Sequence, residues 1–202
     1  MVAAIQNFLT SCAISFDLPI LDWIQANLRS SIMDVVMPIV TLLGDGGIFW
    51  IAWAILLLLF PKTRRIGLGM GFAMILGLLV CNVTLKPLIA RPRPYDFQET
   101  EFGVMIHLLI ERQHDFAFPS GHTIASFEAA TVLLKHSEKM GLPAMILAIV
   151  IAFSRLYLYV HYPTDVIFSV FAGILFAFIG DWLAGLVAPK LGPRKRGKYE
   201  RY

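Results

Sequence analysis

The sequence predicts an all-α protein that lies in a membrane as an antiparallel bundle of about six transmembrane helices. Apolar residue types make up 57% of the 202 residues and charged types only 15%, and the mean hydropathy is +0.70. Soluble domains have about half apolar residues and about a quarter charged ones. This composition excludes most soluble enzymes, disordered proteins and nucleic-acid-binding proteins.

Six segments are candidates for membrane crossings, each of which needs about 20 mainly apolar residues. Two of them are imperfect. Residues 46–60 would extend only about 22 Å at a rise of 1.5 Å per residue, and residues 31–44 are interrupted by Asp34 and Pro38. The six candidates are residues 31–44, 46–60, 66–85, 116–134, 142–160 and 166–188.

Residues 18–28 precede the first candidate crossing and carry apolar residues at helical spacing, interrupted by Asp22 and two amides. This pattern suits a helix in the membrane interface with Trp23 at headgroup depth. The first turns of a longer, tilted first crossing would show the same pattern, so both interpretations remain open. Residues 1–8 lack a basic residue, and we therefore expect no cleaved signal peptide.

The basic residues predict the orientation of the bundle. Twelve lie on one side, namely Arg29, Lys62, Arg64, Arg65, Lys135, Lys139, Lys190, Arg194, Lys195, Arg196, Lys198 and Arg201. Five lie on the other, namely Lys86, Arg91, Arg93, Arg112 and Arg155. Because cytoplasmic loops carry the excess of Lys and Arg, the twelve are expected inside the cell, together with both termini. The chain then divides into an N-terminal interfacial segment (1–30), a transmembrane domain (31–188) and a basic cytoplasmic tail (189–202).

The basic residues of the tail account for the sequence pI of about 9.0. A basic segment beside a membrane is attracted to anionic lipid headgroups, and we expect the tail to lie near them. A nucleic-acid partner is not needed to explain the pI. Residues 95–115 form the one long connection, on the outer side. It contains an amphipathic stretch, residues 102–113, that would serve either as a lid on the bundle or as a simple cover, and both interpretations remain open.

Three segments that reach the outer face carry the residues of chemical interest. Lys86 and Arg93 follow the third crossing, Ser120, Gly121 and His122 open the fourth, and the fifth ends at Arg155, shortly before His161 and Asp165. Helices connected in this way bring such segments into one pocket.

The pocket would hold the positive charges of Lys86, Arg93 and Arg155 near hydrocarbon depth. Buried cations without an anionic partner are costly, and a phosphate supplies the missing charge. A helix start behind Gly121 also favours an anion. His161 and Asp165 are four residues apart, the spacing at which a carboxylate can orient a histidine.

These residues resemble the three motifs of the type 2 phosphatidic acid phosphatase superfamily. The first is Lys86-x6-Arg93-Pro94, the second is Pro119-Ser120-Gly121-His122, and the third is Ser154-Arg155-x5-His161-x3-Asp165. The motifs occur in the order of the family, and the resemblance covers residues 45–185.

The resemblance implies a membrane lipid phosphatase that hydrolyses a phosphomonoester or diphosphate without a metal or another cofactor. It implies that His161 attacks phosphorus and becomes a phosphohistidine, that Asp165 orients His161, and that His122 protonates the leaving oxygen and later activates water. The implied phosphate ligands are Lys86, Arg93, Ser120, Gly121 and Arg155.

The substrate and three charged residues are left open. Undecaprenyl diphosphate is the preferred substrate by analogy, with phosphatidylglycerol phosphate and phosphatidic acid as alternatives. An anion transporter or a non-catalytic scaffold in the plasma membrane is the alternative of another class. Arg91 forms a second Arg-Pro pair beside the first motif and has no assigned role. Glu128 and Asp181, which lie inside predicted crossings, are expected to pack in the bundle rather than to act in catalysis.

Overall fold

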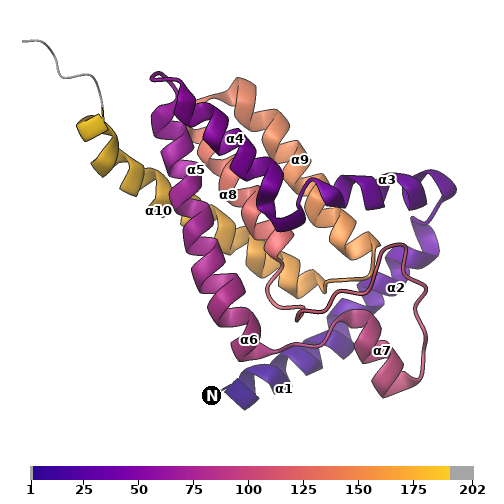
Figure 1. The fold of residues 1–202 in the computed structure, drawn as a ribbon. Coiled ribbons are helices and arrows are strands. Elements are labelled where there is room, and N and C mark those ends of the chain that lie inside the picture. The colour runs from indigo at the N-terminus through magenta and orange to yellow at the C-terminus, as the bar shows by residue number, and fades with distance from the viewer. Residues whose placement is uncertain (1, 192–202) are drawn as a thin grey trace, which may run out of the picture.

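The computed structural model describes residues 2–191, and within that range the chain is helical and contains no strand (Figure 1). The prediction of an all-α fold is therefore confirmed. The predicted basic tail continues beyond Leu191 and lies outside the described residues. The α-helices are α1 (Val2–Cys12), α2 (Leu18–Asn27), α3 (Ser31–Leu42), α4 (Ile48–Leu59), α5 (Arg64–Gly77), α6 (Lys86–Ile89), α7 (Pro94–Phe102), α8 (Gly121–His136), α9 (Glu138–Tyr157) and α10 (Pro163–Leu191).

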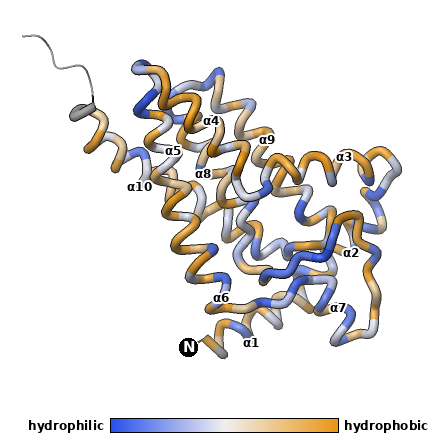
Figure 2. The backbone as a smooth tube through the Cα atoms, in the orientation of Figure 1, coloured by the Kyte–Doolittle hydropathy of each residue, from blue (hydrophilic) through white to orange (hydrophobic). Residues whose placement is uncertain are grey.

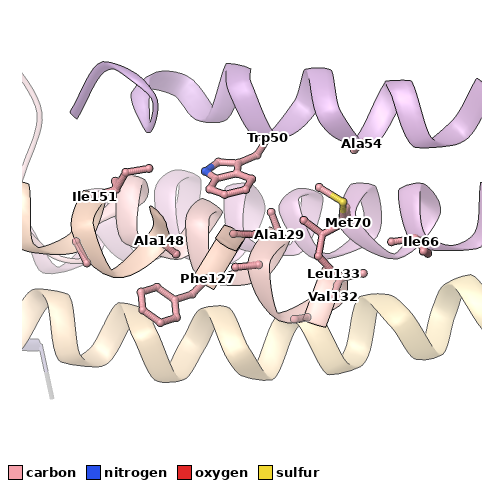
Figure 3. Packing of buried hydrophobic residues seen from close by; sticks show 14 of the residues in the cluster. Trp50, Ala54, Ile66, Met70, Phe127, Ala129, Val132, Leu133, Ala148 and Ile151 are labelled. Carbon is pink, nitrogen blue, oxygen red and sulfur yellow. The ribbon is translucent and has the colours of Figure 1, made fainter. Parts of the chain in front are cut away.

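The centre of the molecule is a bundle in which α10 packs along α5 and α8, α8 packs along α9, and α4 packs along α5. Its core contains the buried side chains of Trp50, Met70, Phe127, Leu133 and Ile151 (Figure 3). The outer faces of the helices remain apolar, and hydrophilic residues gather at the turn after α4 and between α6 and α8 (Figure 2). Such an apolar outer surface is suited to contact with lipid.

Close packing of α5 against α10 depends on glycine. A Cβ atom at Gly180 would lie 2.6 Å from the backbone nitrogen of Ala73 and 2.6 Å from the carbonyl oxygen of Gly69. Membrane helices associate mainly through such van der Waals packing, which small residues at the contact permit.

Four helical segments among residues 2–191 are long and apolar enough to cross a membrane, and the pair α3 and α4 makes a fifth if it counts as one bent crossing. Helix α8 has 16 residues, or about 24 Å of helix, and is shorter than a usual crossing. The four segments are Ala4–Asn27, Arg64–Phe102, Glu138–Tyr157 and Pro163–Ala188.

The structure differs from the predicted pair of separate crossings at residues 31–44 and 46–60. The bend between α3 and α4 is 40°, so the two helices continue in a similar direction instead of running antiparallel. The cause is the turn between them, where Gly46 and Gly47 have φ angles of +56° and +68°. Glycine adopts this left-handed conformation without the steric cost of a Cβ atom.

Helices α1 and α2 form one long helical segment with a π-helical turn at Ala13–Asp17 between them. They run across the end of the bundle that carries α6 and α7 (Figure 1). Gln6 donates a hydrogen bond to the carbonyl oxygen of Ile89 at 2.9 Å, and Gln25 donates one to that of Tyr157 at 2.8 Å. Residues 18–28 are thus not the first turns of α3, which starts anew after Ser30, and their place in the membrane interface stays a prediction.

The opposite end of the bundle carries the basic turns. Asp181 of α10 accepts a hydrogen bond from Lys135 at 2.7 Å and lies 2.6 Å from the Nε2 atom of His136 and 3.8 Å from Arg65. Asp181 thus pairs with basic side chains and does not line the cavity that the motif residues border. Because α1 begins beside α6, the first described residues lie at the other end of the bundle from the basic turns, unlike the expectation that both termini share the basic side.

Candidate active site

The three motif segments border one cavity of about 550 Å³. Lys86 is the first residue of α6, and Arg93 directly precedes α7. His122 lies in the first turn of α8, Arg155 lies in the last turn of α9, and His161 lies in the connection to α10. All five line the cavity, so the ends of several helices contribute to one site.

The chain before and after Lys86 has local features that direct both cations of the first motif to the cavity. A π-helical stretch, Leu78–Leu85, precedes Lys86, and Ala90 ends α6 in a left-handed conformation with φ of +49°. Arg93 is extended, and Pro94 begins α7 directly after it. Proline is favoured at the first position of a helix, where no backbone donor is required.

The anionic partner of these cations is Asp115, which the motif analysis missed. Its carboxylate pairs with Arg93 and accepts a hydrogen bond from Lys86 at 2.5 Å, and its carbonyl oxygen accepts one from Arg93 at 3.0 Å. Burial alone would raise the pKa of Asp115, but the hydrogen bond from Lys86 and the charge of Arg93 bring this pKa below its usual value. Asp115 is therefore a carboxylate at neutral pH.

Asp115 belongs to the irregular segment 103–120 between α7 and α8, where Gln113 and His114 also border the cavity. The helix of this outer connection is α7, at residues 94–102, and it precedes the amphipathic stretch identified in the sequence. A segment without periodicity offers no pattern from which the pairing of Asp115 could be predicted.

Arg155 is only 2% exposed and has no carboxylate within hydrogen-bonding distance among residues 2–191. It donates a hydrogen bond to the hydroxyl of Thr41 at 2.5 Å, and its Nε atom has no partner within the described chain. Buried polar groups are usually hydrogen-bonded. The unused donor is therefore available to an oxygen of a bound ligand.

His161 is 1% exposed and has its two ring nitrogens in different surroundings. Its Nε2 atom lies 2.9 Å from the guanidinium of Arg93, while its Nδ1 atom lies 3.5 Å from the carboxylate of Asp165 and makes no hydrogen bond. Burial and the charges of Arg93 and Arg155 hold the pKa of His161 well below its usual value. The imidazole is thus neutral, with a lone pair on one nitrogen.

His122 approaches the turn between α3 and α4. Its Nε2 atom lies 3.5 Å from Asp45, a neighbour that is remote in sequence. A Cβ atom at Gly44 would lie 2.7 Å from Cδ2 of His122. A larger residue at this position would therefore displace the histidine.

Gly121 and Ser120 are placed differently from each other. Gly121 lines the cavity, but Ser120 does not. The backbone N–H of Ser120 donates to the hydroxyl of Ser169 at 2.9 Å, and its own hydroxyl accepts from Thr123 at 3.0 Å. The backbone of Ser120 thus anchors the start of α8 to α10, while its hydroxyl keeps its own hydrogen to donate, and its role as a phosphate ligand stays a prediction.

One part of the cavity wall, formed by α5 and α8, is more apolar. Met74, Ile124 and Ala125 border it together with Glu128. Glu128 is 1% exposed, lies against Gly77 and leaves one carboxyl oxygen without a partner. It packs inside the bundle as expected, and it also borders the cavity.

These positions create a pocket that is suited to a lipid phosphate. Side-chain cations gather at one end, a neutral histidine with a carboxylate behind it lies among them, and a second histidine stands on the same cavity wall. Fixed donors in a buried site stabilise charge that develops during phosphoryl transfer. The apolar part of the cavity has room for hydrocarbon next to the charged end.

Several known proteins are similar to this chain in sequence and in fold. An undecaprenyl-diphosphatase from Sulfolobus acidocaldarius is 34% identical over 138 residues, which are 68% of this chain and 61% of that protein. An undecaprenyl-diphosphatase from Bacillus subtilis is 28% identical over 161 residues, 80% of each chain. This chain thus spans less than two thirds of the archaeal relative.

Two solved structures resemble the fold. Aquifex aeolicus LpxE aligns with a TM-score of 0.69 and 25% identity, over 82% of this chain and 94% of that one. A transmembrane PAP2 type phosphatidylglycerolphosphate phosphatase from Bacillus subtilis aligns with a TM-score of 0.66 and 25% identity, over 96% of this chain and 93% of that one. The family model described as PAP2 superfamily matches residues 66–185. With this match over more than half of its length, the chain belongs to the PAP2 superfamily of membrane phosphatases.

Proposed function

We propose that this protein removes the terminal phosphate of a membrane lipid through a covalent phosphohistidine at His161. The observation that supports it most is the position of His161, which lines the cavity with Nε2 beside Arg93 and Nδ1 facing Asp165. Lys86, Arg93 and Arg155 share the cavity wall with it. A neutral nucleophile among fixed cations is the arrangement that phosphoryl transfer requires.

In the first step, the phosphate displaces the carboxylate of Asp115 and takes the donors of Lys86 and Arg93. The Nε2 lone pair of His161 then forms a bond to phosphorus while the bond from phosphorus to the leaving oxygen breaks. His122 gives its proton to that oxygen. The positive charge left on the imidazole of His161 is stabilised by Asp165 at the Nδ1 side.

In the second step, His122 takes a proton from water as the water oxygen bonds to phosphorus. The bond from phosphorus to His161 breaks, inorganic phosphate forms, and the proton returned to His122 restores the starting state. Asp45, whose carboxylate lies 3.5 Å from Nε2 of His122, is placed to accept a hydrogen bond from the protonated ring in this cycle.

Undecaprenyl diphosphate is the substrate that we favour, because two of the relatives are named undecaprenyl-diphosphatases. Its products would be the lipid monophosphate and inorganic phosphate. Phosphatidylglycerol phosphate is the second candidate, supported by a Bacillus subtilis phosphatidylglycerophosphatase that is 30% identical over 160 residues. Phosphatidic acid has the same phosphomonoester chemistry and completes the panel to be tested.

The site is proposed to face the extracytoplasmic side of the plasma membrane. The cavity lies at the end of the bundle opposite the basic turns around Arg65 and Lys135. Since basic turns favour the cytoplasm, the cavity would open on the other side, where the phosphate head of an outer-leaflet lipid is within reach.

The first prediction concerns metal ions. Side chains supply the cations of this pocket, so we expect phosphate release from a lipid phosphate in detergent to continue in excess EDTA. Magnesium should not increase it. A complete loss with EDTA that magnesium reverses would contradict the mechanism, and an absence of phosphate release under any condition would favour a transporter or scaffold.

The second prediction separates the two histidines by leaving group. His122→Ala should lower turnover of an alkyl phosphate by about 10²-fold or more, the usual contribution of a general acid. It should slow the first step with p-nitrophenyl phosphate, measured as the burst of nitrophenolate, far less, because nitrophenolate leaves without protonation. The second step, in which His122 activates water, slows for both substrates. His161→Ala should abolish turnover of both substrates. Equal losses of the first step on both substrates for His122→Ala would show that His122 is not the general acid.

The third prediction concerns Asp115, whose carboxylate occupies donors that the phosphate needs. Asp115→Asn should lower KM roughly three- to fivefold, a modest effect because the ion pair is half exposed, and should strengthen inhibition by inorganic phosphate. Steady-state kinetics at neutral pH measures both. Asp96→Asn is the matched control, because Asp96 pairs with the exposed Arg112 and does not line the cavity. A higher KM for Asp115→Asn alone would show that Asp115 helps to bind the substrate.

A further inference from the structure

Arg91 is a buried cation that the proposed mechanism does not use. It is 4% exposed, and its guanidinium lies 3.7 Å from the ring centroid of Tyr162. One guanidinium nitrogen pairs with the carboxylate of Asp165 and donates to the hydroxyl of Thr164 at 2.8 Å. The other donates to Asp17 at 2.8 Å. Arg91 therefore joins two carboxylates, neither of which is exposed.

Asp17 reaches this position from the N-terminal helical segment. It is the last residue of the π-helical turn between α1 and α2. Its carboxylate accepts hydrogen bonds from the backbone N–H of Thr164 at 2.9 Å and from the hydroxyl of Thr164 at 2.7 Å. Thr164 directly precedes Asp165, so Asp17 contacts both the residue beside Asp165 and the arginine that binds Asp165.

Asp165 itself has few degrees of freedom. One of its oxygens is held by Arg91, and the other accepts from the backbone N–H of Tyr162 at 3.0 Å while lying 3.5 Å from Nδ1 of His161. A carboxylate fixed on one side and facing His161 on the other is suited to orient that ring.

We propose that Arg91 and Asp17 are positioning residues for the reaction. Arg91 holds Asp165 behind His161, and Asp17 determines the net charge of the network that it forms with Arg91 and Asp165. This inference rests on the proposed role of His161 as the nucleophile. It also gives the N-terminal segment a part in the reaction, although that segment contributes no residue to the cavity wall.

The charges of the network determine its effect. Asp17, Arg91 and Asp165 together carry one net negative charge behind His161. Without Arg91 the two carboxylates would carry two negative charges, and without the charge of Asp17 the network would be neutral. Negative charge near an imidazole stabilises its protonated form, and only the unprotonated form has a lone pair for attack.

Other charged and titratable groups around His161 stay the same in these variants. These groups are Lys86, Arg93, Asp115, His122, Arg155 and Tyr162. They belong to α6, to the segments before α7 and α8, to α8 itself, and to α9 with the connection that follows it. Opposite changes in the Asp17 and Arg91 variants would thus arise from the network behind His161.

The experiment is the pH dependence of phosphoenzyme formation on the full chain in detergent, with radiolabelled lipid phosphate as the probe. The rate falls on the acidic side as His161 takes up a proton. Arg91→Gln should move this acidic limb to higher pH, and Asp17→Asn should move it to lower pH, each by about one pH unit. Arg91→Lys, which keeps the charge but loses the forked geometry, should lower the rate with a smaller shift.

Asp22→Asn is the matched control. Asp22 lies on α2 and accepts a hydrogen bond from Tyr159 at 2.7 Å, so its loss weakens docking of the same N-terminal segment without changing the charge behind His161. Its acidic limb should stay in place. Unchanged limbs, or shifts of the same sign, in Arg91→Gln and Asp17→Asn would overturn the inference.

Two results keep this inference distinct from the proposed function. Wild-type protein that carries no label on His161 would refute the phosphohistidine proposal itself. Wild-type protein that is labelled, with Asp17→Asn labelled at the same rate and with the same pH dependence, would refute only the positioning role. If Arg91→Gln does not fold, the comparison of Asp17→Asn with Asp22→Asn still decides the question.

Discussion

The burial of three cations at one end of a membrane helix bundle is the constraint on which the site depends. Lys86, Arg93 and Arg155 lose hydration there, and isolated buried charges are too costly to persist without partners. Asp115 compensates two of them, while Arg155 has only the hydroxyl of Thr41 and an unused donor. With Asp115 the three cations leave a net charge of +2, which the phosphate dianion of the proposed substrate would balance.

The rest of the fold holds these cations in place from several directions. Close packing at Gly180 fixes α10 against α5, and the turn at Gly44 lets α3 and α4 approach His122. Helices α1 and α2 lie across the end of the bundle and contribute Asp17 to the pairing of Arg91 with Asp165. His161 is therefore supported by segments that are far apart in the sequence.

The sequence predicted the helical class and the six motif residues that border the cavity, because these residues lie at helix ends, where hydropathy and spacing are informative. It did not predict Asp115, Asp45 or Asp17, whose partners are determined only when distant segments pack together. It also gave no sign that Ser120 bonds to Ser169 and Thr123, contacts that join the start of α8 to α10. The bend between α3 and α4 depends on left-handed glycines, and hydropathy does not report backbone conformation.

The most direct test of the central claim is to locate the covalent intermediate. Protein quenched during turnover of a lipid phosphate labelled in its terminal phosphate should carry the label on His161, in an acid-labile and base-stable bond, as expected for phosphohistidine. His161→Ala should carry none, while His122→Ala should still be labelled with an activated substrate such as p-nitrophenyl phosphate. Label on any other residue, or label that persists in His161→Ala, would contradict the account.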